Sequence, residues 1–462
     1  MSVPIGPRAA AGRRTPDSGF DAIVIGAGCA GLSAATALVE QGARVLVLEA
    51  RPVLGGRASA VRDPATGEKL DNGQHVLMGC YDATLSFFRR IGTSDRVRWQ
   101  AGLAVTMIDR IGHHSTLKLP PLPAPLHLLA GVLAWDALSW HEKASVVRVG
   151  AALRTASGRA SGAEIVAGSG LTVRQWLTSK GQAPRLIELF WEPLALAALN
   201  QPIGEAAVDT FLEVLSRMFG PEADRAALVM PAVPLDELYA EPARQWLEAH
   251  GSQVRTRSVT KVRVERERVL GVEVRGERID APLVIAGVPW FALPALFDAP
   301  PAALADLLRR AQATAASPIV TVNLWYDRPV LDEMLVGLPG RVFQWVFDKG
   351  QIFGRSHSHL SLVSSGAAGV VARSNEELIA VARREVEEAL PRAAVAALRG
   401  ASAVRERQAT FSLAPGQPAR PGTRTGVDGL LLAGDWVDTG LPATIESAVV
   451  SGHWAADAAR RS

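Results

Sequence analysis

A glycine-rich turn near the N-terminus narrows most sharply what this chain can fold into. Residues 26–31 read GAGCAG, which has the spacing G-x-G-x-x-G, and they follow the apolar run AIVI at 22–25. The Ala- and Leu-rich segment 32–41 comes next, and a second apolar run, ARVLVLE, occupies 43–49. Strand, tight turn, helix and strand in this order predict a βαβ unit, because parallel strands buried on both faces are continuous runs of Val, Ile and Leu. The sequence therefore predicts an α/β fold with a Rossmann-type nucleotide-binding domain.

The residue types in this turn suit a pyrophosphate. Gly26 permits the tight turn, Gly28 lets the backbone approach the anion, and Gly31 lets helix and strand pack closely. Ala30 lies in the first turn of the helix, whose N-terminus faces the anion. Glu49, at the end of the second run, can accept hydrogen bonds from ribose hydroxyls. Plain turn glycines are the alternative, but they do not account for the strand, helix and acid together.

A second glycine cluster follows this acid immediately. Residues 49–57 read EARPVLGGR, so a glycine pair and an arginine come directly after Glu49. Backbone N–H groups and a guanidinium here would bind the same pyrophosphate. The expected cofactor-binding residues of this segment are Ala50, Arg51, Gly55, Gly56 and Arg57.

The C-terminal region completes a two-part signature. With the N-terminal motifs, Gly434-Asp435 and a helix starting near Thr444-Ile445-Glu446 resemble the FAD proteins of the amine oxidase and phytoene desaturase superfamily. The resemblance implies that Asp435 holds the ribityl chain and that the helix N-terminus faces the flavin, where it favours the anionic reduced form. An ordinary turn at Gly434-Asp435 is the alternative.

Other segments resemble the squalene-associated members of that superfamily, the hydroxysqualene dehydroxylases of bacterial hopanoid and squalene synthesis. They are DNGQHVLMGCY at 71–81, FWEPL at 190–194 with Asn200, and the C-terminal stretches 433–436 and 443–448. The resemblance implies a cofactor-facing Gly73 and a Val259 backbone that contacts the adenine; a strand-core valine is compatible with that role. It also implies non-covalent FAD, because no Cys or His lies between Asp435 and Ser451.

The candidate catalytic residues are Asp71, Gln74 and His75. His75 is titratable, lies beside Gly73, and can donate a proton near neutral pH. A buried structural histidine and a plain turn at 71–73 are the alternatives.

The resemblance predicts reductive dehydroxylation of hydroxysqualene to squalene, with NAD(P)H or an electron-transfer protein as reductant. The first alternative is a carotenoid-type desaturase, which runs hydride transfer in the opposite direction. The second is a non-catalytic isoprenoid-binding protein of the same fold. An amine oxidase is disfavoured because Trp436 is the only aromatic residue between Asp435 and Glu446.

Composition excludes further classes and suggests a location. The 49 Lys and Arg against 46 Asp and Glu give no basic block for nucleic acid. The two cysteines, Cys29 and Cys80, have no metal-ligand spacing, so we expect no metal site and a reducing cytoplasm. Prolines break the apolar stretch 119–140, which predicts no membrane span. Part of that stretch could instead make peripheral contact with the inner face of the cytoplasmic membrane, or form an ordinary core helix: Leu126, Leu128, Leu129, Val132, Leu133, Trp135 and Trp140.

The order of the patterns predicts a discontinuous nucleotide domain. Residues 1–19 are expected to form a flexible tail, and 20–104, 241–294 and 406–462 the FAD-binding domain. Residues 105–240, mostly helical in pattern, and 295–405 are expected to form an inserted α+β substrate domain. Strands are predicted within 261–274, 283–286, 319–326 and 430–433, and helices within 186–199, 375–390 and 444–459.

Overall fold

A five-stranded parallel sheet is assembled from three separate stretches of the chain. The computed structural model describes residues 19–63, 66–123, 126–157, 170–219, 222–355 and 357–460, so the tail predicted at 1–19 lies almost wholly outside it. The sheet has the strand order β10-β2-β1-β14-β20, and every neighbouring pair is parallel. Its strands are β1 (Ala22–Ile25), β2 (Val45–Leu48), β10 (Gln253–Arg255), β14 (Val284–Ala286) and β20 (Leu430–Leu432). This confirms the predicted Rossmann-type fold.

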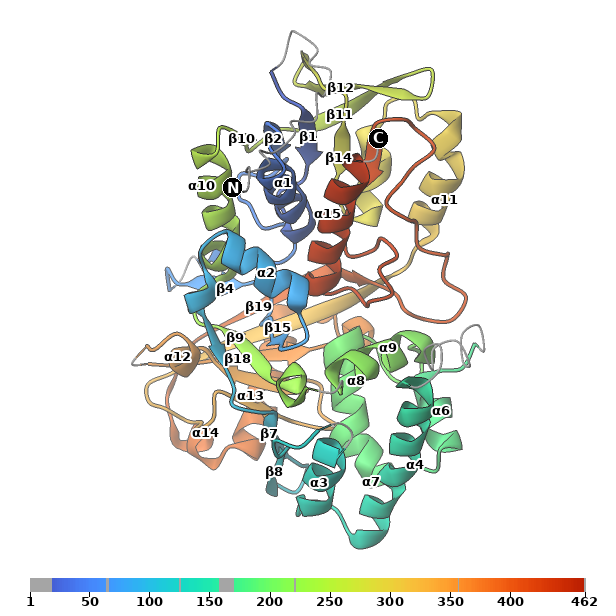
Figure 1. Cartoon of the computed structure of the whole chain (residues 1–462). Helices are drawn as coiled ribbons and strands as arrows, with labels where there is room; N and C mark the ends of the chain where they lie inside the picture. Colours follow the sequence, from blue (N-terminus) through green and yellow to red (C-terminus); the bar gives the residue numbers. More distant parts are fainter. Residues whose placement is uncertain are drawn as a thin grey trace, which may run out of the picture.

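Two helices distant in sequence lie side by side against this sheet (Figure 1). They are α1 (Cys29–Glu40), which connects β1 to β2, and α15 (Ile445–Ala459). A Cβ at Gly452 of α15 would lie 2.4 Å from the Ala30 carbonyl oxygen, so this glycine lets the helices approach closely. The contact brings the C-terminal helix α15 against the first turn of α1, next to the glycine-rich turn.

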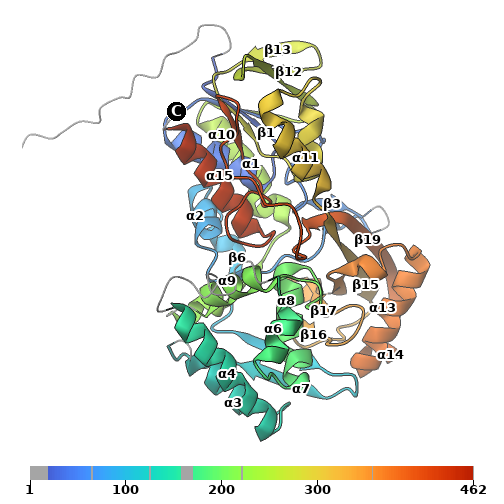
Figure 2. The ribbon, with the colours of Figure 1, turned by 90° about the vertical axis from the view of Figure 1, so that its right-hand side faces the viewer.

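A seven-stranded mixed sheet forms the centre of the second part of the molecule (Figures 1 and 2). Its order is β19-β15-β18-β17-β16-β7-β8, and its pairs are antiparallel except β16 with β7. One face is apolar: Val320, Val322 and Leu324 pack with α13 (Asn375–Ala389). The strands are β7 (Ala104–Ile108), β8 (His114–Lys118), β15 (Ala316–Tyr326), β16 (Leu335–Gly337), β17 (Trp345–Asp348), β18 (Ser358–Ser364) and β19 (Leu398–Phe411).

The remaining elements include three smaller sheets: β3 (Ala60–Arg62) with β4 (Lys69–Asp71); β5 (Leu77–Met78), β9 (Leu228–Pro231) and β6 (Val97–Trp99); and β11 (Thr260–Glu265), β12 (Arg268–Val274) and β13 (Glu277–Asp280). The other α-helices are α2 (Asp82–Arg90), α3 (Leu126–Ala134), α4 (Trp140–Ser157), α6 (Val173–Ser179), α7 (Pro184–Leu186), α8 (Glu192–Leu199), α9 (Val208–Met218), α10 (Glu241–Ala249), α11 (Ala305–Ala313), α12 (Lys349–Ile352) and α14 (Pro391–Val395). Short 3-10 or π segments are η1 (Ser94–Arg96), η2 (Ile187–Trp191), η3 (Ala223–Ala226), η4 (Asp236–Ala240), η5 (Trp290–Leu296), η6 (Ala302–Leu304) and η7 (Ala367–Gly369).

Two predicted elements differ in detail. The strand pattern expected within 261–274 is a hairpin, because the chain turns at Arg266 and Glu267, whose φ angles are 50° and 60°. A turn with two positive φ values matches the twist of a hairpin. The helix expected at 186–199 contains the π segment η2 between α7 and α8. Within 105–240, expected to be mostly helical, the chain also forms β7, β8 and β9.

The packing of α11 bears on the predicted domain boundary at 295. This helix lies with η5 beside the sheet that contains β11 and β12, and away from α13 (Figure 2). We propose that the nucleotide domain extends to the start of β15, near residue 315, because Leu304, Leu307 and Leu308 complete its core there.

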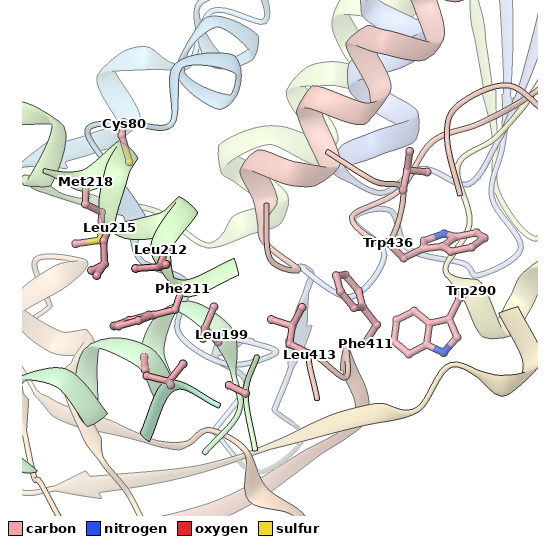
Figure 3. Close-up of a cluster of buried hydrophobic side chains, with 14 of the residues drawn as sticks. Cys80, Leu199, Phe211, Leu212, Leu215, Met218, Trp290, Phe411, Leu413 and Trp436 are labelled. Carbon is pink, nitrogen blue, oxygen red and sulfur yellow. The ribbon is translucent and has the colours of Figure 1, made fainter. Parts of the chain in front are cut away.

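One buried apolar cluster extends across both parts of the molecule. Figure 3 shows residues of α8, α9 and the loop before α2 on one side, and residues of η5, β19 and the C-terminal loop on the other. The labelled members are Cys80, Leu199, Phe211, Leu212, Leu215 and Met218 on the first side, and Trp290, Phe411, Leu413 and Trp436 on the second. We call this set the central apolar cluster.

Candidate functional site

The first glycine turn has the geometry that the sequence predicted. Gly26 has a φ of +100°, and a Cβ there would lie 2.5 Å from the Gly287 carbonyl oxygen. A Cβ at Gly31 would lie 1.9 Å from the Gly26 carbonyl oxygen, so helix α1 can meet the turn only at a glycine. Gly28 is the N-cap of α1, and no side chain caps this helix start. The N-terminus of α1, with Ala30 in its first turn, therefore presents its N–H groups to an anion.

The second glycine cluster lies directly against the first. A Cβ at Gly56, whose φ is +59°, would lie 3.3 Å from the Gly28 Cα, and Gly55 N–H donates to the Ala27 carbonyl at 2.8 Å. Two backbone turns meet here with only glycines between them. This close approach leaves room for a pyrophosphate that side chains would fill, so the cradle fits a dinucleotide.

Glu49 connects the two turns. Its carboxylate oxygens accept hydrogen bonds from Ala27 N and Arg51 N, both at 2.9 Å. Its neighbour Ala50 is exposed, and the Arg51 guanidinium hydrogen-bonds the Gly56 carbonyl oxygen. The Glu49 side chain thus lies at the edge of the cradle, where a ribose would be placed.

Val259 lies next to this acid but outside any strand. Ser258 N–H donates to the Glu49 carbonyl oxygen at 2.8 Å. Val259 itself is 64% exposed, which makes the strand-core interpretation of this valine wrong. Its backbone lies beside the predicted nucleotide residues.

Arg57 and Asp435 form an ion pair that closes the other end of the cradle. The guanidinium Nη2 lies 2.5 Å from Asp435 Oδ1, and Nη1 donates to the Ala409 carbonyl at 2.8 Å. Arg57 also lies over the Trp290 ring, 5.4 Å from its centroid. Gly434, with φ +153°, donates its N–H to Ser451 Oγ at 2.8 Å. The two ends of the predicted signature are therefore in direct contact.

The start of α15 divides the predicted residues into two roles. Thr444 caps the helix by accepting from Ser447 N at 3.1 Å, and Ile445 begins it. The Glu446 side chain is turned away to α2, where it accepts from Ala83 N at 3.0 Å and Thr84 N at 2.9 Å. Burial raises the pKa of this carboxyl. Any contact of Glu446 with a cofactor is thus left to its backbone, because its carboxylate caps another helix.

Two of the three candidate catalytic residues, Asp71 and Gln74, contact Lys349, a residue that no sequence pattern identified. Lys349 Nζ lies 2.7 Å from Asp71 Oδ2 and 2.5 Å from Gln74 Oε1. Gly73, with φ +84°, separates these partners and faces Thr321 of β15. The Lys349 and Asp71 side chains are each only 2% exposed. A single lysine after an apolar strand matches no known sequence motif, so the sequence did not predict a role for Lys349.

The His75 side chain is half-buried. Its Nδ1 atom is inaccessible to solvent and has no partner at normal hydrogen-bond geometry among the described residues. Burial lowers the pKa of His75, and the nearby Asp71 carboxylate only partly opposes this shift. The imidazole is therefore neutral at pH 7. This favours a positioned, neutral imidazole over a standing proton donor.

A second buried polar group lies on the face of the seven-stranded sheet opposite α13. His359 Nε2 lies 3.0 Å from Asn323 Oδ1, and its Nδ1 lies 3.4 Å from Glu68 Oε2. The His359 side chain lowers the pKa of Glu68 most strongly, and burial opposes this shift. The neighbouring Arg355 and His357 lower the pKa further, to about 2. No sequence pattern identifies these residues, because they come from β18, β15 and the loop before β4 and meet only in the folded chain.

An open cavity of about 490 Å³ lies beside this group, lined by Arg62, Glu68, Lys69, Glu237, Arg355 and five smaller or apolar residues. Its charged wall does not suit a hydrocarbon, because burying charge against apolar groups is costly.

The parallel sheet, the glycine cradle and the contact between its two ends define a dinucleotide-binding protein of the Rossmann type. The chain belongs to the flavin containing amine oxidoreductase family, whose model matches residues 29–460. It is therefore a flavin-dependent enzyme that acts as an oxidoreductase.

Two curated relatives extend over nearly the whole chain. A hydroxysqualene dehydroxylase from Sinorhizobium fredii is 30% identical over 94% of this chain and 97% of its own length. A 15-cis-phytoene desaturase from Arabidopsis thaliana is 24% identical over 95% of this chain and 80% of its own length. Among solved structures, an oxidoreductase from Methanosarcina mazei superposes with a TM-score of 0.73 at 18% identity, covering 94% of this chain and 99% of the other.

Proposed function

We propose that this chain binds FAD non-covalently and catalyses the reductive dehydroxylation of hydroxysqualene to squalene in hopanoid and squalene synthesis. The observation that carries this proposal is the 30% identity to a hydroxysqualene dehydroxylase along almost the full length of both chains. The site geometry is compatible with it, because the glycine cradle, Glu49 and the Arg57–Asp435 pair suit a dinucleotide.

Non-covalent attachment is supported by the cysteines. Both are buried, and burial raises the pKa of Cys29 to about 12 and that of Cys80 to about 11. The thiolate is the reactive form, so neither is a ready nucleophile toward a flavin at neutral pH. The test is acid precipitation of the holoprotein, after which the yellow colour should stay in the supernatant.

When bound, the flavin supplies or accepts a hydride. The residues of this chain do the rest: the α15 N-terminus favours negative charge at its end of the site, and the Gly73–His75 turn borders the reacting region. An apolar wall around the substrate would exclude water from an allylic cation, and each methylene that it buries would contribute about 0.8 kcal/mol to the binding of a long isoprenoid. The side chains of the central apolar cluster are of the type that such a wall needs, and they also serve as ordinary core packing.

The reaction and its direction are tested together under anaerobic conditions. The protein with reduced FAD should convert hydroxysqualene to squalene, and deuterium placed on the reduced flavin should appear at the carbon that bore the hydroxyl. Introduction of double bonds into phytoene or squalene, with hydroxysqualene untouched, would instead establish the desaturase alternative, to which the phytoene desaturase relatives give some support.

The non-catalytic isoprenoid-binding alternative is tested by colour. A purified protein without flavin absorbance, which takes up no FAD on dialysis, would favour it. The physiological reductant, NAD(P)H or an electron-transfer protein, is tested by following anaerobic bleaching of the bound flavin with each donor.

We also propose peripheral contact with a membrane through α3 and the start of α4. No helix among the described residues is long and apolar enough to cross a bilayer. Leu126, Leu133 and Trp140 are 52%, 36% and 75% exposed, whereas Leu128, Val132 and Trp135 are buried in the core. The predicted apolar stretch therefore divides into a core face and an exposed face, and only the exposed one could meet lipid.

A further inference from the structure

We propose that Lys349 is a positioning residue that holds the turn Gly73-Gln74-His75 in its working conformation. This inference rests on the proposed function, since that turn borders the predicted flavin site. Lys349 begins the short helix α12, which directly follows strand β17 of the seven-stranded sheet. The turn that it contacts instead follows β4, a strand of a separate two-stranded sheet. One buried ammonium thus connects two parts of the molecule at the turn that carries His75.

The Lys349 ammonium contacts two acceptor oxygens and one aromatic ring. Two of its protons face Asp71 Oδ2 at 2.7 Å and Gln74 Oε1 at 2.5 Å, and the Phe353 ring centroid lies 4.5 Å from Nζ. Asp71 in turn accepts from Leu235 N at 3.0 Å. Two of the three ammonium protons are thus taken by acceptors, and the side chain is only 2% exposed, so we expect Lys349 to act through its partners and not by direct contact with substrate.

The lysine also fixes which way the Gln74 amide points. An ammonium is a donor only, so the amide must turn its oxygen toward Nζ. Its nitrogen then faces the His75 carbonyl oxygen, to which it donates at 3.2 Å. The chain Lys349, Gln74, His75 carbonyl holds the backbone that carries the imidazole. Without the lysine, the amide could rotate freely and release that carbonyl.

Stability alone is a weak reason for this arrangement. Burying an ion pair costs desolvation energy that its attraction often only balances, and apolar replacements of whole buried pairs are frequently neutral. An apolar pair at 71 and 349 would serve packing equally well. What an apolar pair cannot supply is the donor that orients Gln74.

The test uses variants that separate positioning from folding. Lys349→Met alone leaves Asp71 buried and unpaired, so it should lower the melting temperature. Lys349→Met with Asp71→Asn removes both charges and should restore most of the melting temperature. Gln74→Met keeps the ion pair and removes only the link to His75. The matched control is Lys69→Met, because Lys69 lies on β4, pairs with Asp236 at 2.6 Å, and has no contact with Gln74 among the hydrogen bonds and ion pairs of the described residues.

Two readouts are expected to move together. Hydrogen exchange followed by mass spectrometry should accelerate in the peptide covering 72–79, and not globally, in the double variant and in Gln74→Met. Single-turnover reaction of the bound flavin with hydroxysqualene should slow at least tenfold while the substrate Kd changes less than twofold. Lys69→Met should change neither.

Wild-type exchange and turnover in both variants would overturn the inference. Acceleration of exchange throughout the chain would also overturn it, by assigning Lys349 to global stability. If wild-type protein leaves hydroxysqualene unreacted, the proposed function fails, but the local exchange readout still decides whether Lys349 holds the turn.

Discussion

Single glycines in the cradle serve different purposes, and the structure separates them. A Cβ at Gly28 would meet only ordinary contacts, the nearest being Gly56 Cα at 3.7 Å, whereas one at Gly31 would overlap the Gly26 carbonyl oxygen at 1.9 Å. Gly28 is thus kept small for the ligand and Gly31 for the fold.

We therefore predict that Gly28→Val folds but purifies without FAD, while Gly31→Val fails to fold. Circular dichroism and flavin absorbance after unfolding measure both outcomes. A Gly28→Val protein with stoichiometric FAD would contradict the assignment of the nucleotide site.

Glu68 gives a prediction on pH. Its pKa in the folded protein is lowered from the ordinary 4.5 to about 2, and its side chain is 19% exposed. A lowered carboxyl pKa stabilises the folded state above the unfolded-state value, and the contribution disappears as pH falls through the folded-state value. The ionised Glu68 should therefore contribute up to about 3 kcal/mol above pH 4.5, with the loss between pH 4.5 and 2.

Urea unfolding of wild type and Glu68→Gln across that pH range measures this contribution. The difference in the free energy of unfolding should be largest near pH 6 and vanish near pH 2. Glu237→Gln is the control, because Glu237 makes a half-exposed ion pair with Lys69 and such pairs contribute little. A pH-independent difference for Glu68→Gln would contradict the prediction.

Which residues the sequence could reveal depended on whether backbone or side-chain chemistry was involved. The cradle glycines were predictable because positive φ and close backbone approach leave glycine almost no substitute. Lys349 and His359 were not, because each acquires its partners only through tertiary contacts with residues distant in sequence. The side-chain direction of Glu446 was unpredictable for the same reason.

At the scale of elements, the Glu446 carboxylate joins two helices. Glu446 lies in the first turn of α15, but its carboxylate accepts from two N–H groups and the Thr84 hydroxyl, the last at 2.6 Å, in the first turn of α2. These donors are otherwise the unpaired N–H groups of a helix start, and Thr84 is fully buried. The contact fixes α2 against the helix whose N-terminus faces the predicted flavin.

We predict that Glu446→Ala lowers the free energy of unfolding by about 2 kcal/mol, because it leaves buried donors without an acceptor. Glu446→Gln should cost less, since it keeps one acceptor oxygen and burial already disfavours the charged form. Denaturant titration of the two variants measures the order. Equal losses would show that the charge, rather than the acceptor oxygen, holds α2.

Elements were predictable where their periodicity was long and unambiguous. The strands β1, β2, β14 and β20 and the helix α15 lie where apolar runs and helical spacing placed them. The β11–β12 hairpin was not resolved into two strands, because Arg266 and Glu267 adopt positive φ angles without the Gly or Asn that usually announces such a turn.

At the scale of the whole molecule, the sequence could predict that one domain interrupts another, but less about how they pack. Strand order follows from pairing partners more than 200 residues apart, such as β1 with β14, and no local pattern encodes them. The order of strand and helix patterns along the chain supplied the domain plan. The central apolar cluster, which joins both parts, is visible only after folding.

The exposed apolar face of α3 and α4 gives a prediction for the whole molecule. These helices lie at the end of the molecule farthest from the parallel sheet (Figure 1), so contact there would leave the nucleotide site open to a reductant. Leu126 and Trp140 are 52% and 75% exposed, while Trp135 is only 1% exposed and would disrupt the core if replaced.

We predict that the double variant Leu126→Asp with Trp140→Asp binds liposomes at least tenfold more weakly than wild type, since each side chain loses on the order of 1.5 kcal/mol of apolar transfer into the interface. Its melting temperature and FAD content should stay unchanged, because neither side chain is buried. Val395→Asp is the matched control, as Val395 is 77% exposed on α14 and outside this face. Cosedimentation with vesicles of mixed neutral and anionic lipid measures the binding. If Val395→Asp loses as much liposome affinity as the double variant, the added negative charge explains the loss. If the double variant binds liposomes as tightly as wild type, this face does not make the membrane contact.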